Sequence, residues 1–350
     1  MPPSATGGLN MQPILKLDAV SRQFRGTPDF AQRIVDFVTR KNSEQVVRAV
    51  DGIDLDVRPG EIVGLVGESG CGKSTLARII SGILAPSQGK ILLEGRDFAA
   101  MSEAERRKAS LSVQMVFQDA TASLNPRKRV METIGEAAVF HGIIRANEMT
   151  AYVSDIMKRV GLDPASRDLY PHQFSGGQRA RIGIARALAV KPRILVCDES
   201  TAALDVSIQA QILNLFVELK RDLDLTYIFV SHDLGMIQNF CDRIAVMYLG
   251  RIVELAETET LFANPHHPYT RALLKEIPTL EPKKRVFTAI KGEMPSPLNP
   301  PSGCHFHPRC VIARPMCSND SPALRETDPN RFAACHFAED FKAKELSDAV

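Results

Sequence analysis

The sequence predicts an α/β fold, and three observations carry that prediction. Short apolar runs at residues 61–66, 113–117, 193–199 and 226–230 are typical of buried strands. Segments in which apolar residues recur with helical spacing separate these runs. A glycine-rich loop joins the first of these runs to the helix that follows it. With 350 residues, the chain is long enough to bury a large core of this kind.

The composition indicates a globular protein, with 44% hydrophobic and 24% charged residues. The formal net charge of +2 gives no field suited to a polyanion, which speaks against nucleic acid as the main partner. No apolar run approaches the roughly 18–20 residues that a membrane-spanning helix needs. We expect residues 1–13 to form a flexible tail without a secretion signal, because no basic segment there precedes an apolar one.

The glycine-rich loop matches the phosphate-binding pattern G-x-x-x-x-G-K-[ST]. It comprises Gly67, Glu68, Ser69, Gly70, Cys71, Gly72, Lys73, Ser74 and Thr75. Its backbone N–H groups and the helix N-terminus attract an anion. Lys73 can reach the β- and γ-phosphates of a nucleotide, and the Ser74 hydroxyl can ligate Mg²⁺. The alternative is a chance glycine turn, but the preceding strand and following helix favour a phosphate site.

Two strands are predicted upstream of this loop, at residues 14–24 and 50–57. Phe24 ends the first and could stack on an adenine ring, although spacing alone favours an ordinary core phenylalanine. Residues 29–41 have the spacing of an amphipathic helix, which we interpret as a packed surface insertion or a docking element.

Downstream of the loop, residues 90–95 predict a strand and Ser102 the N-cap of a helix. Gln118 follows the strand at residues 113–117. Ligand-facing residues of open α/β sheets lie at such strand ends, so Gln118 could reach Mg²⁺ or an attacking water, or could simply terminate the strand. Residues 130–170 have helical periodicity and predict an inserted helical subdomain.

A second candidate anion site is formed by Ser175, Gly176, Gly177 and Gln178 at the start of a strongly helical segment. Exposed N–H groups and a hydroxyl at a helix N-terminus suit a phosphate. The alternative interpretation is an ordinary helix cap.

The strand predicted at residues 193–199 ends in two acidic residues. Asp198 is predicted to hold Mg²⁺, and Glu199 to polarise the hydrolytic water as a general base. The alternative is that both acids cap the next helix. Asp205 closes the next turn, and His232 ends the strand at residues 226–230, where it could contact a γ-phosphate or serve a structural role.

Residues 244–248 and 251–254 predict a hairpin. Residues 265–268, with two prolines around two histidines, are interpreted as a linker, and beyond Pro278 the chain becomes proline-rich and loop-like.

Four cysteines crowd into this C-terminal part: Cys304, Cys310, Cys317 and Cys335. We expect a reducing compartment, which disfavours disulfides. Four thiolates suit an iron–sulfur cluster or Zn²⁺, and the thiols could also be unliganded. His305, His307 and His336 adjoin them and could substitute as ligands.

The order of these motifs resembles the ATP-binding subunit of an ABC transporter over about residues 14–265. Residues 116–119, 123–126, 205–211 and 267–273 and the cysteine-rich tail are similar to the dipeptide/oligopeptide importer branch, which includes nickel and glutathione systems. The insertion after Phe24 resembles the second of the two ATPase subunits of such importers. The resemblance implies a phosphate-loop NTPase (RecA-like) core, an antiparallel β subdomain, a helical subdomain with the signature motif at 119–190, and a C-terminal importer-type region at 266–350.

The resemblance also implies roles for single residues. Phe24 would stack on adenine, Gln118 would sense Mg²⁺, Glu199 would be the catalytic base and His232 the γ-phosphate switch. Residues 175–178 would bind the γ-phosphate of the opposite subunit, so hydrolysis would need a head-to-tail dimer. Some members of the branch carry a [4Fe–4S] cluster in the tail, which favours a cluster on the four cysteines over zinc.

Two positions depart from the branch. Ser200 replaces its usual proline, and Ala202 replaces the serine of its Ser-Ala-Leu-Asp turn. Loss of that hydroxyl bears on coupling between the two sites, while every catalytic position is present, so we expect an active subunit.

The resemblance implies a peptide importer at the cytoplasmic face of the inner membrane, with a paralogous ATPase, two permease subunits and an extracytoplasmic solute-binding protein as partners. The rival hypotheses are a soluble ABC ATPase of DNA repair or translation, and a redox or metal sensor centred on the cysteine tail.

Overall fold

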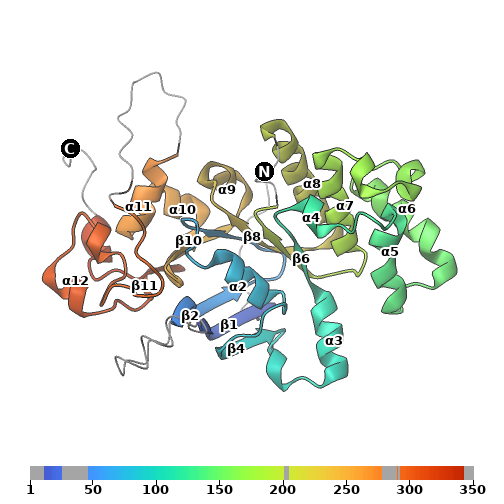
Figure 1. Cartoon of the computed structure of the whole chain (residues 1–350). Coiled ribbons are helices and arrows are strands. Elements are labelled where there is room, and N and C mark those ends of the chain that lie inside the picture. Colours follow the sequence, from blue (N-terminus) through green and yellow to red (C-terminus); the bar gives the residue numbers. More distant parts are fainter. Residues whose placement is uncertain (1–11, 26–45, 201–204, 278–289, 291, 343–350) are drawn as a thin grey trace, which may run out of the picture.

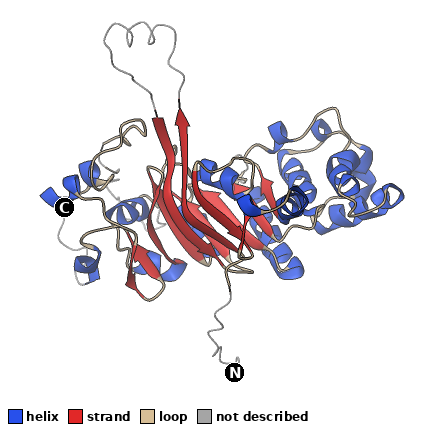
Figure 2. Cartoon of the chain, turned by 90° about the horizontal axis from the view of Figure 1, so that it is seen from below, coloured by secondary structure: helices blue, strands red, loops and turns tan. Residues whose placement is uncertain are grey.

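Two sheets form the centre of the computed structural model, which describes residues 12–25, 46–200, 205–277, 290 and 292–342. A helical lobe lies on one side of the sheets and the C-terminal region on the other (Figures 1 and 2). The predicted α/β fold is therefore confirmed. The expected insertion helix at residues 29–41 lies outside the described residues.

The larger sheet has, among the described residues, eight strands in the order β11-β12-β10-β9-β3-β8-β7-β6. The strands from β9 to β6 in this order pair in parallel, and β10, β12 and β11 extend the sheet with antiparallel pairs. Their bounds are β3 Ile62–Val66, β6 Val113–Val116, β7 Ile194–Asp198, β8 Thr226–Ser231, β9 Arg243–Tyr248, β10 Arg251–Glu257, β11 Arg325–Asp328 and β12 Arg331–Ala333. Residues of β3, β7, β8 and β9 are buried along their whole length, which explains their continuous apolar runs.

The smaller sheet is antiparallel, with the order β2-β1-β4-β5 in the described part of the chain. It comprises β1 Leu15–Arg25, β2 Val46–Val57, β4 Gln88–Leu93 and β5 Arg96–Asp97. Buried and exposed residues alternate at the start of β1 and the end of β2, as expected for a sheet with one face on the core. This is the antiparallel β subdomain that the resemblance implied.

The helices surround the larger sheet, and α2 packs against β7 and β8. Their bounds are α2 Lys73–Ile80, α3 Glu103–Ser112, α4 Ala120–Ser123, α5 Val130–Phe140, α6 Met149–Arg159, α7 Gly176–Leu188, α8 Val206–Leu223, α9 Leu234–Phe240, α10 Thr258–Ala263, α11 Pro268–Lys275 and α12 Pro315–Asn319. Ser102 caps α3 as predicted, accepting a hydrogen bond from the Glu105 N–H while Glu105 bonds back to the cap. The predicted helical subdomain corresponds to α4–α7.

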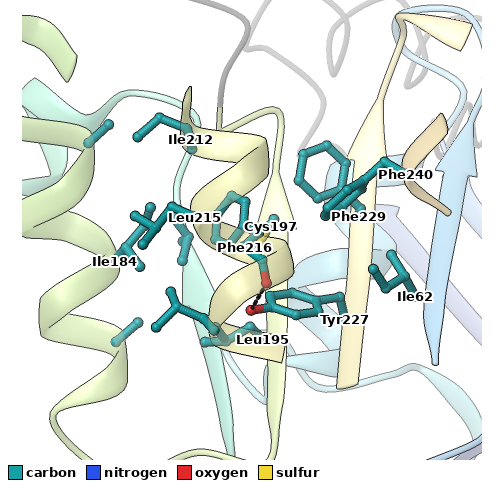
Figure 3. Packing of buried hydrophobic residues seen from close by; sticks show 14 of the residues in the cluster. Ile62, Ile184, Leu195, Cys197, Ile212, Leu215, Phe216, Tyr227, Phe229 and Phe240 are labelled. Carbon is teal, nitrogen blue, oxygen red and sulfur yellow. Dashed lines mark hydrogen bonds between the residues drawn. The ribbon is translucent and has the colours of Figure 1, made fainter. Parts of the chain in front are cut away.

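Aromatic side chains of α8, α9 and β8 pack on the larger sheet (Figure 3). The rings of Phe216, Tyr227, Phe229 and Phe240 meet with centroid separations of 4.9–6.5 Å. The buried Tyr227 hydroxyl donates to the Phe216 carbonyl at 3.1 Å, so its polar atom is satisfied. This packing fixes the helices against the strands whose ends carry the functional residues.

The segment that follows α10 differs from its prediction as a linker. His266 and His267 are 0% and 1% exposed, and their N–H groups donate to the buried Glu254 carboxylate at 2.7 and 2.9 Å. Strand β12 pairs with β10, and β11 pairs with β12, so these two segments, which were expected to be loop, join the C-terminal region to the central sheet. Strands of only three and four residues have little sequence pattern of their own, because their structure depends on pairing with a strand that is distant in the sequence.

His267 provides a test of this buried junction. Burial lowers its pKa to about 3, against an ordinary value of 6.5. Below pH 6.5, His267 is therefore protonated in the unfolded chain but stays neutral in the folded chain. The free energy of unfolding consequently falls as the pH drops from about 6.5 towards 3, by up to about 1.4 kcal/mol per pH unit.

We expect His267→Asn to lose this part of the pH dependence while keeping the cap of α11, since Nδ1 of His267 accepts the Tyr269 N–H. Urea unfolding at pH 7 and pH 5 measures the difference. Equal pH slopes for the variant and the native protein would contradict the burial of a neutral His267.

Candidate nucleotide site

The phosphate loop lies between the C-terminal end of β3 and the N-terminus of α2, as predicted. Gly67 and Gly72 adopt φ angles of +151° and +110°, where L side chains are rare. A Cβ at Gly67 would lie 2.2 Å from the Met247 carbonyl oxygen, and one at Gly72 would lie 2.1 Å from that of Ala49. The loop therefore threads between two other backbone segments, and only glycine fits at both points.

Lys73 and Ser74 open helix α2 with their side chains in the site. Lys73 is 4% exposed, and its ammonium donates to the carbonyls of Gly67 and Glu68 at 2.7 and 2.9 Å. The Ser74 hydroxyl donates to Asp198 Oδ1 at 2.9 Å. Burial raises the pKa of Asp198 above its usual range, and the bond from Ser74 opposes that rise. Two of the predicted Mg²⁺ ligands thus meet, and both offer oxygen donors suited to Mg²⁺.

Gln118, Glu199 and His232 also meet, although they follow three different strands. Gln118 Nε2 donates to Glu199 Oε2 at 2.7 Å, and His232 Nδ1 lies 3.4 Å from Glu199 Oε1. Glu199 has φ +44°, an uncommon value for a residue with a side chain. Its N–H bonds the Val230 carbonyl at 3.0 Å, which holds this conformation against β8. Strain held in place by neighbouring contacts is common at functional sites.

A hollow of about 260 Å³ is lined by most of these groups, but not by Asp198 or His232. Its predicted lining residues are Ser69, Gly70, Cys71, Gly72, Lys73, Ser74, Thr75, Gln118 and Glu199. The hollow is also lined by residues that were not predicted: Val47, Arg48 and Ala49 of β2, Leu249 and Gly250 of the β9–β10 turn, and Pro297. Arg48 adds a second cation beside Lys73, which favours a polyphosphate ligand. No sequence motif marks these positions, because only the packing of the smaller sheet on the loop brings them to the site.

Phe24 lies near the end of β1, opposite Val47 of β2, which lines the hollow. Its ring is 39% exposed, and the Arg22 guanidinium lies 4.9 Å from the ring centroid. An exposed Phe24 paired with a residue that lines the hollow differs from the core phenylalanine that spacing alone favoured. With Arg22 over one face of the ring, the other face is the one on which a base could stack.

Residues 175–178 lie apart from this hollow, at the N-terminus of α7. Ser175 caps the helix, with its hydroxyl accepting the Gln178 N–H at 3.3 Å and the Gln178 side chain accepting the Ser175 N–H at 2.9 Å. Ser175, Gly176 and Gln178 are exposed. Asp205 is likewise exposed, at the start of α8. These residues do not line the hollow of their own chain.

The four C-terminal cysteines line one small pocket together with His267, His307 and His336. Burial raises the pKa of Cys310 to about 11 and that of Cys335 to about 12, so these thiols are protonated at neutral pH. In the part of the chain that the structure describes, no group of three or more His, Cys, Asp or Glu side chains is placed to hold a metal ion. The cysteines therefore converge without the ligand arrangement that the predicted cluster or zinc site needs.

Comparison with known proteins identifies the family. Residues 50–202 match the ABC transporter family, and residues 253–317 match the oligopeptide/dipeptide transporter C-terminal region. The oligopeptide transport ATP-binding protein AppF of Bacillus subtilis is 45% identical over 93% of this chain and 98% of its own length. This chain belongs to the ATP-binding proteins of ABC transporters.

Other relatives of this ABC ATPase agree. The di/tripeptide transport ATP-binding protein DppF of Pseudomonas aeruginosa is 45% identical over 84% of this chain and 91% of its own. Among solved structures, CbiO1 of Clostridium perfringens has a TM-score of 0.59 at 29% identity, covering 72% of this chain and 91% of its own. A second cassette, solved as a dimer with ADP and Pi, has a TM-score of 0.59 at 26% identity, covering 70% and 98%.

The family membership confirms several expectations. The chain is an ABC-type ATPase, for which ATP and Mg²⁺ are the expected ligands. ATPases of this kind work with membrane permease components. Within the described residues, no helix of this ABC ATPase is long and apolar enough to cross a bilayer.

The threading of the loop between two backbones gives a test of the ATP site. We expect Gly72→Ala to lose ATP binding, because its Cβ would overlap the Ala49 carbonyl and its φ of +110° would be strained by about 1–3 kcal/mol. Gly183→Ala is the matched control, since nothing lies within 4 Å of its added Cβ and a helical Gly→Ala change is neutral or stabilising by up to about 1 kcal/mol.

Titration calorimetry with ATP and thermal unfolding measure the two effects separately. Native ATP affinity in the Gly72→Ala protein would show that the loop tolerates a side chain there, contrary to the geometry.

Proposed function

We propose that this ATPase powers the import of peptides or a related small solute through an ABC transporter. The observation that carries the proposal is the match of residues 253–317 to the C-terminal region of oligopeptide and dipeptide transporters. The relatives named for oligopeptide and di/tripeptide transport, which align with most of the chain, support the same substrate class.

Hydrolysis is assigned to groups that line the hollow, together with Asp198 and His232, which contact two of its lining residues. Lys73 binds the β- and γ-phosphates, and Ser74 and Asp198, with Gln118 beside them, would hold Mg²⁺. That ion, when bound, neutralises charge on the phosphates. Glu199 orients and deprotonates the attacking water, and His232 contacts the γ-phosphate. The hydrogen bond from Gln118 to Glu199 and the 3.4 Å approach of His232 Nδ1 to the same carboxylate support these roles, because they favour one position of the carboxylate.

We further propose that each site is completed by a second subunit. The exposed nest of residues 175–178 lies outside the hollow of its own chain, which suits a γ-phosphate contact across a head-to-tail dimer. The related cassette solved as a dimer with ADP and Pi supports this arrangement. The partner is proposed to be a paralogous ATPase, with this chain as the second of the pair. Asp205, at the start of α8, is proposed as a further ATP-binding residue.

The proposed complex also contains two permease subunits and is served by an extracytoplasmic solute-binding protein. The ATPase would lie peripherally at the cytoplasmic face of the inner membrane. Residues 14–265 are proposed as the nucleotide-binding domain and residues 266–350 as an importer-type C-terminal region, although β11 and β12 share the central sheet.

For the C-terminal region we propose a [4Fe–4S] cluster on Cys304, Cys310, Cys317 and Cys335, with zinc as the alternative. The convergence of the four thiols on one pocket supports the proposal. Binding would require the side chains to turn towards a common centre and lose their protons.

Replacing Glu199 tests the importer and its base together. Glu199→Gln keeps the shape and the contacts to Gln118 and His232 but cannot accept a proton. In the complex assembled with its permease subunits, we expect hydrolysis and peptide uptake to fall roughly 10²–10⁴-fold while ATP binding is retained. The matched control is Glu218→Gln on the exposed side of α8.

Two results would overturn these assignments. Steady-state hydrolysis at the native rate in Glu199→Gln would show that another group is the base. A protein that stays off the membrane when the permeases are present would support a soluble ATPase of the DNA-repair or translation type.

Anaerobic purification tests the cysteine proposal. We expect brown protein with about four irons and four sulfides per chain, and loss of both in a Cys310→Ser variant. Colourless protein holding one zinc would support the alternative, and protein free of both metals would exclude a metal site. Cys241→Ser, a buried cysteine outside the pocket, is the control.

A further inference from the structure

An ion pair joins the C-terminal region directly to the phosphate loop. The Arg309 guanidinium donates to both carboxylate oxygens of Glu68, at 2.9 and 3.1 Å, across 241 positions of sequence. The Arg309 side chain is 5% exposed and that of Glu68 is 26% exposed. Glu68 is the second residue of the loop, so this bidentate contact acts on the segment that is to bind phosphate.

A cluster of aromatic residues supports the ion pair. The Tyr269 hydroxyl accepts the backbone N–H of Glu68 at 2.9 Å, and Arg309 also donates to the Tyr248 hydroxyl at 3.4 Å. Phe306 packs against both tyrosine rings, with centroids 5.3 Å away in each case. The backbone and the side chain of Glu68 are therefore both held by residues that follow the phosphate-loop core in the sequence.

Arg309 is also tied to the cysteine pocket. It ends the short 3-10 turn His307–Arg309, which lies between Cys304 and Cys310. The His307 N–H donates to the Cys304 carbonyl at 2.9 Å, and the Cys310 N–H to the His307 carbonyl at 3.2 Å. A movement of either cysteine would therefore move the turn that carries Arg309.

Charge explains why the pair matters for nucleotide. Glu68 places a carboxylate in a loop whose ligand is a polyanion, which on its own opposes binding. Arg309 neutralises that carboxylate and fixes its direction. Without Arg309, a half-buried negative charge would remain unpaired beside the phosphates, and the loop would lose one of its anchors.

We infer that Arg309 is a positioning residue of the ATP site: through Glu68 it holds the phosphate loop in its phosphate-binding shape and couples the cysteine-bearing C-terminal region to nucleotide affinity. The inference rests on the proposed assignment of ATP to this loop. By linkage, ATP bound at the loop must stabilise the turn at residues 304–310 to the same extent that the turn favours ATP.

Arg309→Met tests the inference in the full-length protein. We expect the KM for ATP and the dissociation constant to rise about tenfold, with a smaller change in kcat, because loop positioning is lost while the groups around Glu199 stay in place. Arg325→Met is the matched control, since it removes an exposed arginine from the same region, whose side chain pairs with the exposed side chain of Glu339, and should leave KM unchanged.

Two further variants separate charge from geometry. Arg309→Lys keeps the charge but loses the bidentate contact, so its KM should lie between those of the native protein and Arg309→Met. Glu68→Gln combined with Arg309→Met removes both charges and should recover part of the affinity lost in Arg309→Met. If the double variant changes the KM for ATP by the product of the two single-variant changes, the two residues are not coupled and the inference is overturned.

Hydrogen exchange provides a readout that a purely structural arginine would not move. A non-hydrolysable ATP analogue should slow exchange at residues 304–310 in the native protein and not in Arg309→Met. Native ATP affinity in a folded Arg309→Met protein, or an unchanged exchange response, would overturn the inference. Absence of ATP binding to the native protein would instead remove the proposed assignment of the loop itself.

Discussion

The site depends on one steric constraint: a loop of backbone must pass between two other backbones with no room for a side chain. Gly67 faces the Met247 carbonyl on one side and Gly72 faces the Ala49 carbonyl on the other. The loop is thereby registered against both β9 of the larger sheet and β2 of the smaller one. Because the contacts are made by carbonyl groups of sheets, the loop can shift only if the sheets shift.

Parallel pairing supplies the rest of the geometry. Strands β6, β7 and β8 run in the same direction, so Gln118, Glu199 and His232 emerge at one edge although 81 residues separate the first two. The aromatic side chains of α8, α9 and β8 pack together against the larger sheet and help to hold these strands in place (Figure 3). Glu199 keeps a left-handed backbone because the β7–β8 ladder continues through its N–H. Positioning on rigid strands is what lets three short polar side chains act as one group.

Predictions from the sequence succeeded where one local pattern specifies the structure. The strand, glycine loop and helix around Lys73, the capped helix after Ser102, and the β9–β10 hairpin all appear as expected, because their signals lie within a few residues. The predictions failed where the local structure depends on residues that are distant in the sequence. Residues 265–268 have the composition of a linker, yet Glu254 binds their N–H groups and buries them. Phe24 was ambiguous because nothing near it in the sequence reports the hollow beside Val47.

The sequence alone determined the chemistry of this protein: a loop without side chains for a phosphate, a lysine and a serine behind it, and acids and amides placed after strands. Those features are local, since spacing along one element dictates which groups it can offer. Only the tertiary structure decided how the elements meet. The pairing of Arg309 with Glu68 joins residues 241 positions apart through a bidentate contact that neither residue's neighbours foretell. Such contacts follow from how sheets and loops pack, and packing is a property of the whole chain.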